Sequence, residues 1–328
     1  MYNEKEVIGR YQKYFDLWDQ SASVRTKPNT YRFNRSQMSH ALQNRHWFIR
    51  DGVPVLNHPL MQHIDAEKEQ YLLGRFLLQF LEYGTLMEHE FINTMLAEMA
   101  MGECGIPIPD RMRLDAFKIY TDEAYHACFN MEATQQIRDY IGLPLSTAWP
   151  LKNSRLDGLR KVIPAGPSKE NFLVRFGIAC ISETIAAKEL SETMKGIVAE
   201  PIYNIFIDHA EDEKRHCMYF NTLFEVVWRN LSVNEQLFLG KSLPKILKAF
   251  VDINTISLAD ALQCIGISTE AAGIIIADSY PTDFSVKRAL SVASVTFRMF
   301  ARLGILDIPE IKNAFIEEGF LQYFAEAA

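Results

Sequence analysis

The sequence predicts an all-α protein built on a four-helix bundle, with an irregular N-terminal arm and additional C-terminal helices. Three observations support this fold class. Four long stretches with helical periodicity follow one another between residues 66 and 231. Breaks that contain Pro or Gly separate several of these stretches. A short pattern, Asp-Glu-x-x-His, occurs twice, at residues 122–126 and 212–216.

The N-terminal arm comes first along the chain. Residues 2–18 predict a short amphipathic helix, and residues 21–57, rich in Ser, Asn, Pro and Arg, predict mostly irregular chain. No role for the arm follows from its sequence. With 328 residues, 48% of them hydrophobic, the chain can bury a large core. We expect a single domain made of an arm (1–65), a bundle (66–231) and a C-terminal cap (232–328).

The bundle helices are expected at residues 66–102, 112–141, 169–194 and 199–231. Gly105 and the Pro107–Pro109 break end the first helix, and Gly142 and Pro144 end the second. Residues 145–168 contain three prolines and predict a crossover between two helical hairpins. Beyond the bundle, helices that cap or wall it are expected at residues 233–250, 258–265, 269–279, 282–302 and 309–324.

Composition and missing motifs exclude several classes of protein. The formal net charge of −7 and the lack of clustered Lys and Arg argue against nucleic-acid binding. Five scattered Cys without a CxxC pair indicate neither a disulfide framework nor a zinc knuckle, so we expect a reducing cytoplasm. No signal peptide and no apolar run long enough to span a bilayer are visible, so no membrane partner is expected. Without a GxGxxG or P-loop motif, an ordinary nucleotide enzyme is not expected either.

The duplicated pattern indicates a dinuclear metal centre. Glu and His three residues apart share a helix face and can reach one ion, although a single copy is more often a surface ion pair. Four-helix bundles that carry a di-iron or di-manganese carboxylate site add one inward Glu from each of the other two helices. Glu88 and Glu183 lie 35 and 30 residues before Glu123 and Glu213. At about 1.5 Å per residue, an antiparallel return over such a distance reaches the same depth.

The two lone Glu residues differ in how clearly they are identified. Glu183 lies in an apolar run, where a carboxylate is costly without a partner or a metal. Glu88 is the preferred ligand from the first bundle helix, and Glu90 is the alternative for the same role. His209 precedes Glu213 by four residues and His216 by seven, so it shares their helical stripe and adds a third imidazole.

The candidate ligands, which are also the candidate catalytic residues through the metals they would hold, are Glu88, Glu123, His126, Glu183, His209, Glu213 and His216. Four carboxylates and three imidazoles favour iron or manganese over Mg²⁺, Ca²⁺ or a thiolate-bound metal. Asp122 and Asp212 are candidate acceptors for the ring N–H groups of the His ligands, with solvated surface Asp as the alternative. Four arginines, which are otherwise helix-surface cations, are candidates to meet a substrate carboxylate: Arg175, Arg288, Arg298 and Arg302.

The order Glu88, Glu123-x-x-His126, Glu183 and His209-x-x-x-Glu213-x-x-His216 resembles the ligand set of the p-aminobenzoate N-oxygenase family of non-haem di-iron arylamine oxygenases. The third His distinguishes this family from ferritins, ribonucleotide reductase small subunits, acyl-carrier desaturases and bacterial hydrocarbon hydroxylases. The resemblance implies a ferritin-like fold, two Fe ions with Mn/Fe as an alternative, and a homodimer. It also implies that O2 and an external electron donor convert an arylamine to a hydroxylamine, nitroso or nitro product.

Two other classes fit the same ligands. One is a di-iron hydroxylase or oxidase that acts on a C–H or aldehyde substrate. The other is a ferritin-like iron-binding protein, against which the long C-terminal region argues, because it adds mass suited to walling off a pocket. We also expect His209 to act as a strong neutral donor that makes the metal-bound oxidant more nucleophilic.

Overall fold

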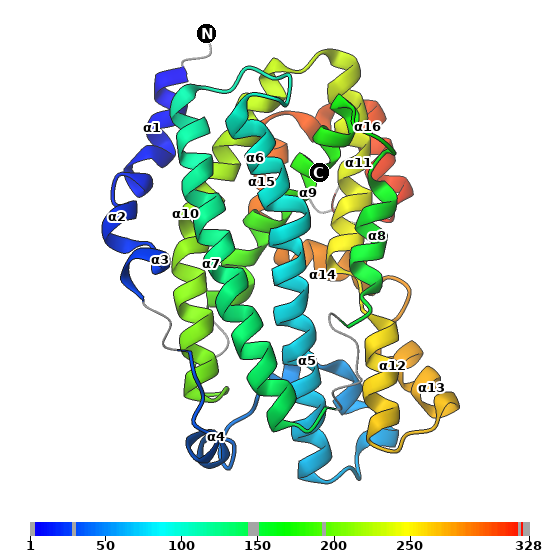
Figure 1. Ribbon diagram of the computed structural model, residues 1–328. Helices are drawn as coiled ribbons and strands as arrows, with labels where there is room; N and C mark the ends of the chain where they lie inside the picture. The colour runs from blue at the N-terminus through cyan, green and yellow to red at the C-terminus, as the bar shows by residue number, and fades with distance from the viewer. Residues whose placement is uncertain (1–3, 28–30, 144–150, 192–194, 321–322, 324–328) are drawn as a thin grey trace.

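The computed structural model describes residues 4–27, 31–143, 151–191, 195–320 and 323 (Figure 1), except for the side chains of residues 187–191. Within these ranges the secondary structure is helical and no strand forms, apart from one isolated bridge between His46 and Val198. The predicted fold class, an all-α ferritin-like bundle with further C-terminal helices, is confirmed.

The N-terminal arm is more helical than its sequence predicts. It contains α1 (Glu4–Phe15), α2 (Trp18–Ser21), α3 (Ser23–Thr26) and α4 (Arg35–Ala41), followed by the short turns η1 (Arg50–Gly52), η2 (Pro54–Asn57) and η3 (Pro59–Met61). The single helix expected over residues 2–18 ends at Phe15, and Trp18 begins a separate one. The side chain of Asn34 caps α4 by accepting hydrogen bonds from two backbone N–H groups. Figure 1 shows α1, α2 and α3 running beside α10 and α7.

The four bundle helices lie within a few residues of their predicted bounds. The first is α5 (Ala66–Met87), which continues through a π-helical turn, η4 (Glu88–Ile92), into α6 (Asn93–Met101). The others are α7 (Asp110–Tyr140), α9 (Lys169–Ser191) and α10 (Glu200–Asn230). Gly102 ends α6 with φ of 77°, a left-handed conformation that favours glycine. Residues 192–194 of the third predicted helix lie outside the described residues.

The C-terminal helices cover the bundle on one side. They are α11 (Val233–Val251), α12 (Thr255–Cys264), α13 (Thr269–Ser279), α14 (Phe284–Val292), α15 (Ser294–Arg302), the turn η5 (Ile305–Asp307) and α16 (Pro309–Glu317). The predicted crossover between the two hairpins contains α8 (Ser154–Val162), and its residues 145–150 are not among those described. Helix α11 packs against α8 and α9, and α12 packs against α5.

Two predictions for this region are wrong. The helix expected over residues 282–302 breaks at Ala293, whose ψ of 27° is not helical, so that α14 contacts α11 while α15 contacts α9 and η5. No Gly or Pro lies near this bend, so the sequence pattern does not indicate it. The last helix, expected to reach residue 324, ends at Glu317, and a turn at residues 318–320 follows, in which Gly319 has φ of 99°. Residues 321, 322 and 324 of this prediction lie outside the described residues.

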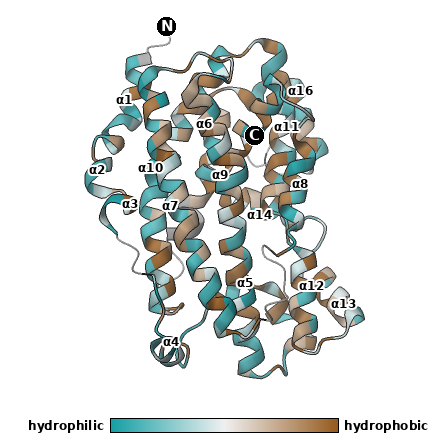
Figure 2. Cartoon of the chain, in the orientation of Figure 1, coloured by the Kyte–Doolittle hydropathy of each residue, from teal (hydrophilic) through white to brown (hydrophobic). Residues whose placement is uncertain are grey.

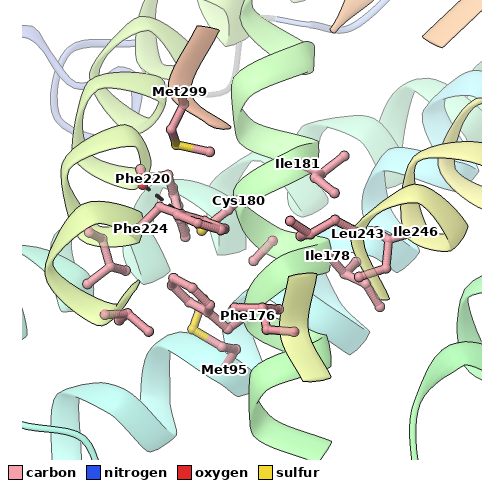
Figure 3. Close-up of a cluster of buried hydrophobic side chains, with 14 of the residues drawn as sticks. Met95, Phe176, Ile178, Cys180, Ile181, Phe220, Phe224, Leu243, Ile246 and Met299 are labelled. Carbon is pink, nitrogen blue, oxygen red and sulfur yellow. Dashed lines mark hydrogen bonds between the residues drawn. The ribbon is translucent and has the colours of Figure 1, made fainter. Parts of the chain in front are cut away.

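Two apolar clusters fill the interior above and below the middle of the bundle. One joins α1, α6, α9, the second half of α10, and α11 with α14, α15 and α16. The other joins α4, most of α5, the first half of α10, the end of α7, and α12 with α13. Figure 3 shows part of the first cluster, where Phe176 of α9 stacks on Phe224 of α10 at 5.5 Å between ring centroids. Figure 2 shows hydrophobic residues along the bundle helices, whereas α4 is mostly hydrophilic. Among the described helices, none combines the length and apolar composition that crossing a bilayer requires.

Candidate metal centre

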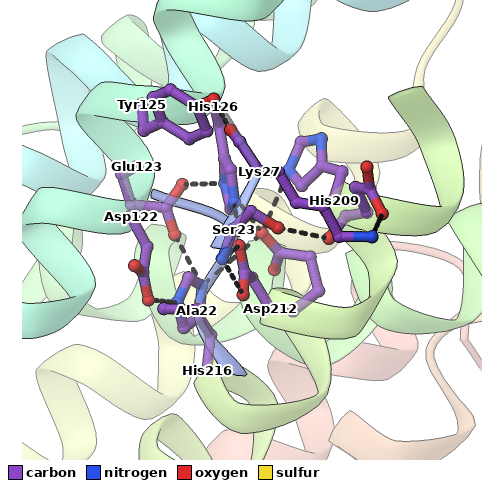
Figure 4. Close-up of polar contacts among 12 residues, drawn as sticks. Ala22, Ser23, Lys27, Asp122, Glu123, Tyr125, His126, His209, Asp212 and His216 are labelled. Carbon is purple, nitrogen blue, oxygen red and sulfur yellow. Dashed lines mark hydrogen bonds and ion pairs between the residues drawn. The ribbon is translucent and has the colours of Figure 1, made fainter. Parts of the chain in front are cut away.

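The seven predicted ligands converge between the two apolar clusters. Glu88 comes from η4, Glu123 and His126 from α7, Glu183 from α9, and His209, Glu213 and His216 from α10. All seven side chains are buried, and the most accessible, His209, is 8% exposed. The two-hairpin topology therefore brings together residues up to 128 positions apart in the chain, as the spacing predicts. Figure 4 shows four of the seven residues, Glu123, His126, His209 and His216, with the polar contacts around them.

The cluster divides into two groups that each suit one ion. One group contains Glu88, His126 and His209, and the other contains Glu123, Glu183, Glu213 and His216. In each group the residues offer one ligand atom apiece, and these atoms lie within 4.8 Å of one another. The groups adjoin, since His126 Nδ1 is 3.3 Å from Glu123 Oε2 and His209 Nε2 is 3.1 Å from Glu213 Oε1. This arrangement is suited to a dinuclear centre.

Glu88 and its alternative, Glu90, lie in the same π-helical turn, but their side chains have different partners. Glu88 is buried and lies 3.5 Å from His209 Nε2, measured from its Oε1. Glu90 points away from the cluster and pairs with Arg160 at 2.6 Å. A π-helical turn adds one residue to the turn and shifts the phase of the helix, and such turns are frequent at functional sites. The structure therefore brings Glu88, and not Glu90, to the other six residues.

The donor atoms fit a bound metal. Within the described part of the chain, one oxygen of each of Glu88, Glu123, Glu183 and Glu213 and the Nδ1 atom of His216 are buried without a hydrogen-bond partner. Buried polar atoms are costly without a partner, and a cation supplies one for a carboxylate oxygen or an imidazole nitrogen. Oxygen and nitrogen donors without a thiolate suit iron or manganese.

Burial and mutual proximity shift the ionisation of these groups. Burial raises the pKa of Glu88 and of Glu183, and the nearby carboxylates raise both further. Burial also lowers the pKa of His209, and the neighbouring His126 ring adds to this. Burial acts to lower the pKa of His126 as well, but the contacts of its ring with Asp212 and Glu123 outweigh it and raise that pKa. Protons therefore compete with metal ions for the cluster.

Asp122 and Asp212 connect the two Glu-x-x-His helices crosswise. Asp122 of α7 has Oδ2 3.2 Å from Nε2 of His216 on α10, and Asp212 of α10 has Oδ2 3.1 Å from Nε2 of His126 on α7. All four side chains are fully buried. Each carboxylate can accept the Nε2–H proton, which leaves Nδ1 of each ring facing the cluster carboxylates.

The N-terminal arm holds both aspartates, and sequence reasoning missed this. Trp18 Nε1 donates to both oxygens of Asp122, at 2.9 and 3.0 Å. The backbone N–H of Ser23 donates to Asp212 at 3.2 Å (Figure 4). Arg215 pairs with Asp212. Burial acts to raise the pKa of Asp212, but the hydrogen bond with His126 and the Arg215 charge outweigh it and lower that pKa to about 2. The pairing with Arg215 was not predicted either, although its position three residues after Asp212 on one helix is a signal that could have indicated it.

A cavity of about 60 Å³ adjoins the cluster on the side of Glu88, Glu123, Glu183, Glu213 and His209. Its remaining walls are mainly apolar. None of the four predicted substrate-binding arginines is among the described residues that line it. Arg175 pairs with Glu98, and Arg302 pairs with Glu225.

A helical bundle with a buried cluster of four Glu and three His defines the chain as a ferritin-like protein suited to binding metal ions. The family model described as P-aminobenzoate N-oxygenase AurF matches residues 35–272, and the chain belongs to this family. The resemblance found in the sequence is thus confirmed, and membership supports an oxygenase with a metal cofactor. A comparison with curated proteins gives no match.

Proposed function

We propose that the protein is a non-haem di-iron oxygenase that N-oxygenates an aromatic amine, giving a hydroxylamine, nitroso or nitro product. O2 is the cosubstrate, and an external donor supplies electrons. The observation that carries this proposal is the third imidazole. His209 Nε2 lies 3.1 Å from Glu213 and 3.5 Å from Glu88, inside the cluster, so all seven positions of the family's ligand order meet in one place.

The two groups of residues would each hold one ion. Glu88, His126 and His209 supply one carboxylate and two imidazoles, while Glu123, Glu183, Glu213 and His216 supply three carboxylates and one imidazole. When bound, two iron ions supply the electrons that O2 needs and that no protein side chain provides. A Mn/Fe pair is the alternative for this donor set.

The side chains prepare the site in three ways. Asp122 and Asp212 fix the ring orientation and tautomer of His216 and His126 by accepting their Nε2–H groups. The lowered pKa of His209 keeps its ring neutral, so that a nitrogen lone pair is available. Burial of the whole cluster excludes bulk water, which protects a reactive oxidant from side reactions.

The test is anaerobic purification, measurement of bound iron and manganese, reduction, and addition of O2 with an arylamine. We expect about two irons per chain, since the cluster offers two groups of donors, and hydroxylamine or nitro product. Loaded protein that leaves arylamines unchanged while oxidising a C–H or aldehyde substrate would establish the di-iron hydroxylase or oxidase instead. Uptake of many irons per chain would indicate iron storage.

Assembly and location belong to the same proposal. Family resemblance supports a homodimer, and the scattered cysteines support a cytoplasmic location. Sedimentation of the loaded protein tests the dimer, and fractionation of cells tests the location.

A further inference from the structure

The cavity beside the candidate metal centre has two chemically different sides. One side is formed by the cluster itself. The other is largely apolar and includes Phe80, Tyr83, Met87, Ile92 and Phe250. Aromatic and aliphatic walls of this kind suit an aromatic ring and offer little to a polar or charged substituent.

One polar side chain on the wall lacks a partner. Asn130 lies on α7, four residues after His126, and is 1% exposed. Its Oδ1 atom is buried without a hydrogen-bond partner among the described residues, although the side chain lines the cavity. A buried amide oxygen in this state is satisfied when a ligand donates to it.

Gly84 keeps the space between Asn130 and the cluster open. A Cβ added to Gly84 would lie 3.7 Å from Nδ2 of Asn130 and 3.8 Å from Oε1 of Glu88. A larger side chain from this position of α5 would therefore fill the space where the cavity meets both groups. The absence of a side chain leaves room for a ligand group that touches the Asn130 amide and faces Glu88 together. A half-turn of this amide exchanges Nδ2 and Oδ1 and presents the oxygen to this space.

Cations lie outside the aromatic wall. Of the described residues that line the cavity, none is Lys or Arg. Cζ of the Arg155 guanidinium lies 3.8 Å from the centroid of the Tyr83 ring, and the guanidinium donates a hydrogen bond to the backbone carbonyl of Phe250. Arg155 and Arg288 line a second cavity, which shares Phe80 with the first. With the amino group at the cluster, a carboxylate on the far side of the ring would lie against the apolar wall, where no described side chain supplies a counter-charge, which is strongly unfavourable.

On the basis of the proposed function, we infer that the substrate is an aromatic amine without an ionised substituent, and that the amide oxygen of Asn130 accepts a hydrogen bond from its amino group. The amino group then lies at the Glu88 end of the cavity, and the ring lies against the apolar wall. This assigns a substrate class and a binding residue.

The first test compares two amines of nearly the same shape. The iron-loaded, reduced protein is dialysed without O2 against 4-aminobenzoate or 4-aminoacetophenone, in which an uncharged acetyl group replaces the carboxylate. We expect the ketone to bind at least about tenfold more tightly, because only the acid buries a charge. Equal or tighter binding of the acid, or no binding of the ketone, overturns the inference. Product analysis after O2 is admitted tests the proposed function separately, since bound ketone that stays unoxidised refutes only that function.

The second test addresses Asn130. Asn130→Leu should weaken binding of 4-aminoacetophenone by about tenfold and leave binding of acetophenone, which has no amino group, unchanged. Asn93→Leu is the matched control, because Asn93 is also buried with an unpaired Oδ1 but is not among the residues that line the cavity. Iron content reports whether each variant folds. Equal loss for both compounds in Asn130→Leu would show that Asn130 only shapes the cavity, and would overturn its role as acceptor.

Discussion

Trp18→Phe is the most informative single change in the N-terminal arm. The substitution keeps an aromatic ring and removes the indole N–H, which lies 2.9 and 3.0 Å from the two oxygens of Asp122. Asp122 is fully buried and 3.2 Å from His216 Nε2, so it would be left with His216 and a more distant Arg215 at 3.8 Å. A hydrogen bond to a buried charged acceptor contributes about 2 kcal/mol, and we expect the free energy of unfolding of the metal-free protein to fall by about that amount.

Metal binding should respond as well. Changing a group that holds a ligand typically lowers metal affinity by about 10- to 100-fold. Trp18 acts through Asp122, one contact further from the ion, so we expect the lower end, about tenfold or 1.4 kcal/mol. The assay is competition with a chelator for Fe²⁺ under argon, together with urea unfolding of the metal-free protein.

Trp47→Phe is the control for this prediction. Trp47 is also a buried indole of the N-terminal arm, but it packs against Tyr140 and Gly74, away from the cluster. Its replacement should reduce stability and leave metal affinity unchanged. If Trp18→Phe and Trp47→Phe bind Fe²⁺ as tightly as the unaltered protein does, the arm does not support the metal centre and the reasoning is refuted.

Three further results are expected. Glu88→Gln should lose at least about tenfold in affinity for metal, whereas Glu90→Gln, whose side chain pairs with Arg160 at the surface, should lose almost none; chelator competition on both variants checks this. Metal affinity should rise with pH, because the pKa values of Glu88, Glu183, His126 and His216 are raised and a metal must displace the protons that these groups hold; affinity that is flat or falls between about pH 6 and 8 would contradict this. Gly240→Ala should destabilise the protein by about 1–3 kcal/mol in urea unfolding, because the added Cβ would lie 2.1 Å from Cδ1 of Ile311, where α11 meets α16.

The sequence was most informative where local periodicity and spacing determine the structure. The bounds of the long helices follow from apolar periodicity and from breakers such as Gly105 and Pro109. The seven clustered residues could be found because antiparallel helices return at a fixed rise per residue, and because a carboxylate such as Glu183 is unexpected in an apolar run.

Features that depend on tertiary contacts could not be found in this way. The contact of Trp18 with Asp122 joins residues 104 positions apart, and no pattern in the polar arm marks it. The bend at Ala293 has no Gly or Pro, and the π-helical turn at Glu88 is recognisable only from the backbone. The cavity wall also escaped prediction, since Asn130 and Phe250 come from helices of different regions and look like ordinary core residues in the sequence.

Locating iron in crystals of the loaded protein by anomalous scattering at the iron edge tests the central claim most directly. The two groups of donors predict two iron peaks in the middle of the bundle, one in contact with Glu88, His126 and His209 and the other with Glu123, Glu183, Glu213 and His216. A single peak, or iron bound only outside this cluster, would contradict the account.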